Sequence, residues 1–309
     1  MRKSLTIRAA ALGAALCLAG GARAAPCDGS LLSAIPARPA DAPTGSAFAR
    51  AVDTVDAAER ERAIETQLDT GNLPGFLRRL APIALTAETA GGRPVRVVVC
   101  VLPDYLSVGS DADFLLVPMR LATALRIGAR YGFTLPTAKL VDAIYAQSAV
   151  RLAPRPLPAS DQMRSTDYYA HHNDLIRQQR SSLGKLTDAL LAGHKKDLVL
   201  TNRLWHALDR VAIYGWHKPD GQPIQTLSTV HGARYADYSH GARLVSTQIY
   251  VDGEPRSIYA ALSDPELARA LSSEGPLTEP RALVARLSLP PAEAAAPAPS
   301  ALAHAAEPR

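Results

Sequence analysis

Residues 210–232 read RVAIYGWHKPDGQPIQTLSTVHG. Two β-prone runs, 210–217 and 222–232, flank the segment KPDGQP, whose Asp-Gly pair is typical of a tight hairpin turn. Further short β-prone runs occur at KKDLVLTN (195–202), ARLVSTQIYVDG (242–253) and EPRSIYAAL (254–262), and Gly, Pro and Asp turns separate them. Short β-prone runs punctuated in this way predict a mainly antiparallel sheet in the C-terminal half.

The N-terminal half favours helices around a buried strand. Helical spacing and end signals predict one helix over 45–71, capped by Thr44 or Ser46 and ended by Gly71. The run PVRVVVCVL (94–102) is rich in β-branched residues and predicts a buried strand. Further helices are expected in the ranges 72–85, 120–132, 136–152 and 168–180.

The expected fold class is therefore α+β. We expect a helix-rich half with central strands (25–153), packed on a strand-rich half that carries the site (154–288). The segment APRPLPASDQ (153–162) holds three prolines and forms either an extended crossing or the boundary between the halves.

Both ends of the chain have compositions that differ from those of a folded domain. Residues 1–24 combine a basic start, a short apolar run and the small-residue sequence ARA, which predicts a signal peptide cleaved near Ala24. This indicates a periplasmic or secreted protein. Residues 289–309 are rich in Pro and Ala and predict a disordered tail. No later apolar run has the length of a transmembrane helix.

Cleavage changes the charge and the cysteine count. The first 24 residues contain four basic residues and no acid, so removing them lowers the formal net charge from +5 to +1. This near-neutral balance argues against a nucleic-acid partner. Cys27 and Cys100 remain, and they form either one disulfide or two unrelated thiols. The oligomeric state is not predicted.

The stretch HGARYADYSHGARLV (231–245) concentrates the groups with the most chemistry. A loop between strands can bring His231, Asp237 and His240 together, as general acid/base groups or as ligands of a divalent metal such as zinc. Five further residues are expected to bind substrate: Tyr235, Tyr238, Arg243, Lys196 and His217. The alternative interpretation is a β-turn with surface histidines and a packed tyrosine.

The same stretch resembles the L,D-transpeptidase motif, an upstream His-Gly followed by Ser-His-Gly-Cys-x-Arg. The matching residues are VHG (230–232) and SHGAR (239–243). The resemblance implies an enzyme of peptidoglycan cross-links, but the position of the nucleophilic cysteine is Ala242 here. The spacing between the two elements is also short, and the usual Thr-Pro-x-Gly element is missing. The resemblance therefore implies a changed or inactive member, and the nucleophile does not carry over.

Several large enzyme classes lose support from absent motifs. The sequence contains no P-loop, no G-x-G-x-x-G after a strand, no H-E-x-x-H and no G-x-S-x-G. We expect an exported hydrolase or transferase that acts on a cell-envelope polymer, peptide or glycan, and we favour a hydrolase. The alternative is a non-catalytic envelope-binding or scaffold protein that carries a degenerate site.

Overall fold

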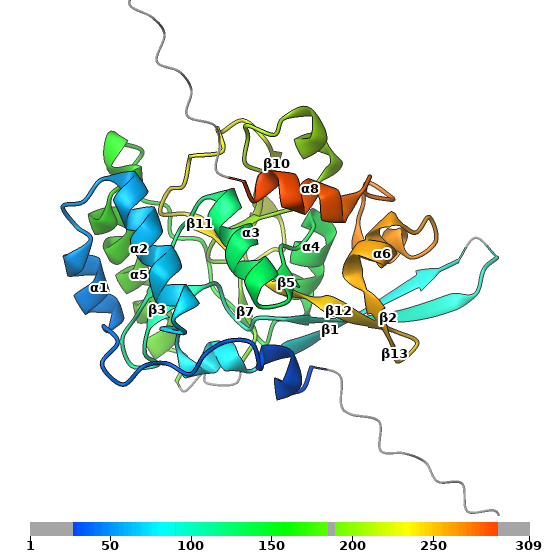
Figure 1. Ribbon diagram of the computed structural model, residues 1–309, viewed down its shortest axis with the longest axis horizontal. Helices are drawn as coiled ribbons and strands as arrows, with labels where there is room; N and C mark the ends of the chain where they lie inside the picture. The colour runs from blue at the N-terminus through cyan, green and yellow to red at the C-terminus, as the bar shows by residue number, and fades with distance from the viewer. Residues whose placement is uncertain (1–26, 90, 185–188, 290–309) are drawn as a thin grey trace, which may run out of the picture.

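The largest sheet is built around β2 (Pro94–Val101), where every side chain from Val97 to Val101 is buried. The computed structural model describes residues 27–89, 91–184 and 189–289 (Figure 1). In this sheet the order is β1-β2-β12-β13, with β5 also paired to β12, and all pairs are antiparallel. The β-branched run that predicted a buried strand thus forms the centre of the fold.

The strands and helices follow one another in a mixed order along the chain. The strands are β1 (Ala81–Glu88), β2 (Pro94–Val101), β3 (Ser107–Gly109), β4 (Phe114–Leu116), β5 (Phe133–Thr134), β6 (Val150–Arg151), β7 (Leu191–Ala192), β8 (Lys196–Leu198), β9 (Ile213–His217), β10 (Pro223–Ser228), β11 (His240–Gly241), β12 (Val245–Val251) and β13 (Glu254–Ser257). The α-helices are α1 (Gly45–Ala51), α2 (Ala57–Asp69), α3 (Leu121–Arg130), α4 (Ala138–Gln147), α5 (Thr166–Ser181), α6 (Ile258–Ser263), α7 (Ala268–Leu271) and α8 (Pro280–Leu287). Four short 3-10 helices are η1 (Gly29–Leu32), η2 (Gly75–Arg78), η3 (Asp161–Arg164) and η4 (Asn202–His206).

A second sheet has the order β10-β9-β8-β11 and positions the candidate site. The β9–β10 pair is the predicted hairpin, and Lys218 N donates to the carbonyl of Gln222 at 2.9 Å across the turn. β8 pairs antiparallel with β9 but parallel with β11. The antiparallel expectation therefore holds for this sheet except at its β8–β11 edge.

One apolar core extends across the two expected halves. A single cluster of buried side chains includes residues from Leu32 to Leu287. Strands β1 and β2 lie before residue 153, and β12 and β13 lie after it, yet all four share one sheet. The fold is α+β, and the Pro-rich segment 153–162 does not separate two cores.

Four local predictions were wrong, one of them at residues 150–151, which were expected at the end of a helix and form β6. The helix expected over 45–71 is two helices, α1 and α2, because the Asp56 carboxylate accepts hydrogen bonds from Ala58 N and Glu59 N and starts a new helix. Residues 81–85, expected in a helix, belong to β1. Residues 258–262, expected in a strand, form α6, because the Ser257 hydroxyl caps the backbone there. Short apolar runs favour either element until tertiary contacts decide.

Cys27 and Cys100 form a disulfide with an S–S distance of 2.04 Å, so the first of the two alternatives holds. Across the described ranges, no helix combines the length and apolarity needed to span a membrane. The expected signal peptide and all of the expected tail except Leu289 lie outside the described residues.

Candidate functional site

β-pairing brings Lys196 next to the His-rich stretch. The chain leaves β10, passes a bridge between Gly232 and Arg210, and enters β11 at His240. In the parallel β8–β11 pair, His240 lies opposite Lys196. The segments KKDLVLTN (195–202) and HGARYADYSHGARLV (231–245) therefore meet at one edge of the second sheet.

Asp237 is the anchor of the loop before β11. One carboxylate oxygen accepts hydrogen bonds from Ser239 N at 2.7 Å and Ser239 Oγ at 2.5 Å. The other accepts the Tyr235 hydroxyl at 3.0 Å and lies 3.9 Å from His240 Nε2. Burial alone would raise the pKa of Asp237, but the adjacent His240, the Ser239 hydrogen bonds and the Lys196 charge together lower it. Asp237 is therefore an ionised, fixed group.

Three aromatic side chains converge above this carboxylate. The His231 and Tyr235 rings stack with centroids 4.0 Å apart and planes inclined by 9°. The His240 ring lies 5.7 Å from Tyr235 and 6.4 Å from His231, measured between centroids. The structure thus places His231, Asp237 and His240 in one cluster, together with Tyr235.

His240 is the most unusual member of the cluster. It is 1% exposed, and neither of its ring nitrogens has a hydrogen-bond partner among the described residues. Burial lowers its pKa to about 4, opposed by the Asp237 charge and reinforced by Lys196, so the ring is neutral at pH 7. An unpartnered buried polar group costs about 1–3 kcal/mol.

His231 differs from His240 in being partly exposed. Partial burial lowers its pKa, with Asp237 opposing the shift and Lys196 reinforcing it. His231 is therefore also neutral at pH 7 and can accept a proton from a molecule at the surface. The pair combines one accessible base with one enclosed ring.

Ser239 is not available as a nucleophile. Its side chain is fully buried, and its hydroxyl donates to Asp237. Ala242, at the cysteine position of the L,D-transpeptidase motif, is 1% exposed and packs in the apolar core. No covalent nucleophile of the resembled kind is present at these two positions.

Three of the expected substrate-binding residues make other contacts. Tyr238 exchanges hydrogen bonds with the backbone of Leu157. Arg243 is fully buried, donates to two backbone carbonyls and covers the Tyr105 ring. His217 stacks on Tyr145 and bonds Asp142 at 2.9 Å. The structure does not bring Arg243 or His217 to the His231–Tyr235 stack.

Two further cationic residues lie near the site. Lys195 is 1% exposed, its ammonium donates to the Tyr238 carbonyl, and burial lowers its pKa to about 7. Arg164, from η3, places its guanidinium carbon 5.8 Å from the Tyr235 ring centroid. No local pattern marks Arg164, because only the tertiary fold brings it to Tyr235.

The geometry gives no support to the zinc alternative. Among the described residues, no group of three or more His, Cys, Asp or Glu side chains is placed to hold a metal ion. His240 Nε2 and Asp237 Oδ2 lie 3.9 Å apart, and both His240 ring nitrogens are enclosed.

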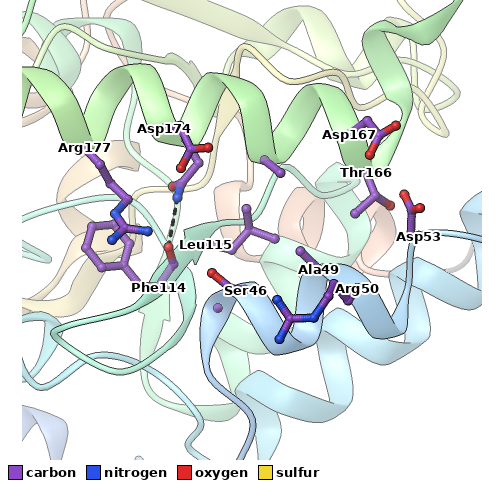
Figure 2. A pocket seen from close by; sticks show the side chains of 13 residues that line it. Ser46, Ala49, Arg50, Asp53, Phe114, Leu115, Thr166, Asp167, Asp174 and Arg177 are labelled. Carbon is purple, nitrogen blue, oxygen red and sulfur yellow. Dashed lines mark hydrogen bonds between the residues drawn. The ribbon is translucent and has the colours of Figure 1, made fainter.

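A separate pocket of about 240 Å³ lies between α1, β4 and α5 (Figure 2). Inside it, the Asn173 side-chain amide donates a hydrogen bond to the Phe114 carbonyl at 2.9 Å. The charged side chains at its rim are Arg50, Asp53, Asp167, Asp174 and Arg177. None of the predicted site residues lines this pocket, and most of its rim charges are exposed to solvent.

Comparison of the chain with protein-family models, curated proteins and solved structures finds no match in any of the three. Any functional conclusion therefore rests on the geometry of the site and on the sequence.

Proposed function

We propose that this protein is an exported hydrolase that cleaves amide bonds in the peptide part of a cell-envelope polymer. The observation that carries the proposal is the convergence of His231, Tyr235, Asp237 and His240 within one short segment, with the His231 ring partly exposed. The predicted signal peptide supports an envelope substrate. The SHGAR resemblance supports a peptide cross-link as the target.

Two features favour amide hydrolysis over the other reactions expected from the sequence. The Ser239 hydroxyl is enclosed, so water is the available nucleophile, and this favours a hydrolase over a transferase. Most glycosidases use a pair of carboxylic acids across the scissile bond. Here Asp237 is the one carboxylate that contacts the cluster among the described residues, and its oxygens are occupied by Ser239 and Tyr235.

The proposed reaction uses the two histidines in different roles. Neutral His231 removes a proton from water while the water oxygen adds to the amide carbonyl carbon. His240, whose ring nitrogens are enclosed, does not contact the substrate and acts as a positioning residue beside Asp237 and Tyr235. His231 then returns its proton to the leaving nitrogen as the carbon–nitrogen bond breaks. Asp237 and Tyr235 hold the loop and the His231 ring in position.

Digestion of purified peptidoglycan tests the proposal. The protein should release peptide fragments detectable by mass spectrometry, and His231→Ala should lower the rate by about 100-fold or more, the usual contribution of general-base catalysis. His240→Ala should also lower the rate. His206→Ala, at an exposed histidine on η4, is the matched control and should keep the wild-type rate. Release of fragments should persist in EDTA, because the proposed reaction requires no metal.

A non-catalytic envelope-binding protein is the second candidate. The core position of Ala242, where the resembled motif has its nucleophile, favours this candidate. In the same experiment, such a protein would sediment with the polymer and release nothing. Absence of fragment release by the wild-type protein would reject the hydrolase.

A further inference from the structure

Two positive side chains rest on aromatic rings at the accessible side of the site. The Lys196 ammonium lies 5.2 Å from the Trp216 ring centroid, and the Arg164 guanidinium carbon lies 5.8 Å from that of Tyr235. Lys196 is half-buried and Arg164 is exposed. Cation–π contact restrains such side chains and leaves their N–H donors free for another group.

Neither cation is neutralised by a carboxylate. Within the described ranges, neither Lys196 nor Arg164 has an Asp or Glu oxygen within 4.0 Å. Arg180, by contrast, forms an ion pair with Asp104. Two unpaired cations beside one reactive cluster are therefore a feature that a ligand can use.

The charges around the stack are predominantly positive. The Lys196 charge lowers the pKa of His231 and that of His240. The Arg164 charge lowers the pKa of Tyr235, whose ring stacks on that of His231. Lys195 adds a further positive contribution at His240. Asp237 is the acid that acts on the same groups, but Ser239 and Tyr235 already occupy its oxygens. The site is therefore suited to an anionic group.

We propose that the site recognises a substrate carboxylate next to the scissile amide, held between the Lys196 ammonium and the Arg164 guanidinium beside the His231–Tyr235 stack. Cleavage of the neighbouring amide rests on the proposed hydrolase function, whereas recognition of the carboxylate does not depend on it. It assigns Arg164 a role in substrate specificity.

The two cations are suited to different parts of the task. A guanidinium presents a planar fork of N–H donors that matches the two oxygens of a carboxylate. An ammonium acts as a point charge and tolerates several directions of approach. Together they would fix the position of the carboxylate, and the peptide bond beside it would be placed near His231.

Equilibrium binding tests the proposal without requiring turnover. The probes are soluble peptide fragments of peptidoglycan with free carboxylates, and the same fragments after amidation, with calorimetry as the readout. The wild-type protein should bind the free acids about 100-fold more tightly than the amides, because each of the two cations contributes about tenfold through a charged hydrogen bond. Lys196→Gln and Arg164→Gln should each raise Kd for the acids about tenfold and leave Kd for the amides unchanged.

Arg50→Gln is the matched control, since Arg50 is an exposed arginine at the separate pocket between α1 and α5. This variant should retain the full preference for the acids. Inorganic phosphate should compete weakly, because it lacks the peptide; competition as strong as that of the acids would indicate a general anion site and overturn the carboxylate assignment. Equal binding of acids and amides, or no binding of either, would also overturn it.

The outcomes separate this proposal from the proposed function. Selective binding of the acids without fragment release would reject the hydrolase and support the carboxylate site. Fragment release with no preference for the acids would support the hydrolase and reject the carboxylate site. Where turnover occurs, Arg164→Gln should raise KM by a larger factor than it lowers kcat, which a general loss of structure would not do.

Discussion

His172, on α5, is fully buried, and its ring centroid lies 5.0 Å from that of Tyr238. Burial holds its pKa far below the usual range, with the charges of Lys195, His194 and His171 adding to the effect. In the unfolded chain the ring binds a proton below about pH 6.5. The folded state does not bind this proton, so stability must fall as the pH falls below about 6.5.

Replacing His172 tests this at the scale of one residue. Between pH 6 and 4.5, the unfolding free energy of the wild type should rise with pH, and His172→Phe should lower the slope of that rise by about 1.4 kcal/mol per pH unit. Urea denaturation at several pH values measures that slope. His171→Gln, at the exposed neighbouring position, should leave it unchanged. An identical slope in wild type and His172→Phe would contradict the neutral buried ring.

His231 gives a second prediction at this scale. Because burial lowers its pKa below 6.5, it remains a base under mildly acidic conditions. The rate of peptide release should therefore fall with decreasing pH along a curve whose midpoint lies below 6.5. Removal of the nearby positive charge in Lys196→Gln should move this midpoint upward. A midpoint that stays fixed in this variant would argue against His231 as the titrating group.

The two His-Gly pairs look alike in the sequence but have different packing. A Cβ atom on Gly241, in β11, would approach Tyr105 Cδ1 to 2.6 Å and Lys195 Cβ to 2.9 Å. A Cβ on Gly232 would meet nothing closer than the Asp209 carbonyl oxygen at 3.8 Å. Only the second pair therefore needs glycine for close approach of two elements.

Alanine substitutions at the two glycines test this at the scale of the β8–β11 pair. Gly241→Ala should destabilise the protein by about 1–3 kcal/mol, as overpacking of a well-filled interior does. Gly232→Ala should change the unfolding free energy by less than about 0.5 kcal/mol. Chemical denaturation measures both. Equal effects at the two positions would show that β11 can move away from Tyr105 without cost.

For individual helices, strands and loops, the sequence predicted the structure where a local sequence signal exists. The Asp-Gly turn predicted the β9–β10 hairpin, and the His-rich loop predicted the cluster at Asp237. The start of α2 also has a local signal, because Asp56 followed three residues later by Glu59 is a helix-capping pattern. Arg164, by contrast, reaches Tyr235 only through the tertiary fold. The pairing of His217 with Asp142 likewise has no local signal.

The disulfide acts at the scale of the whole molecule. Cys27 and Cys100 are 73 residues apart, and their bond joins the first described residue to the buried strand β2. Closing a loop of this length stabilises a fold by about 4 kcal/mol, mainly by restricting the unfolded chain. The bond thus supports the sheet that holds both halves together.

Cys27→Ser tests this contribution. The variant should lose about 2–5 kcal/mol of unfolding free energy. The wild-type protein in reducing buffer should lose a similar amount, and Cys27→Ser should not respond to the reductant. A variant as stable as the oxidised wild type would show that the loop is already ordered without the covalent link.

The position of β2 has a consequence for how the chain is made. Val99 pairs with Ile83 on one side and with Ile249 on the other. A growing polypeptide that has not yet reached β12 therefore offers β2 only one neighbour, and its other hydrogen-bonding edge is open to foreign strands. Pairing between distant segments also slows folding. We expect newly made chains to depend on holding chaperones until nearly the last strand has emerged, and fragments that end before residue 245 to aggregate.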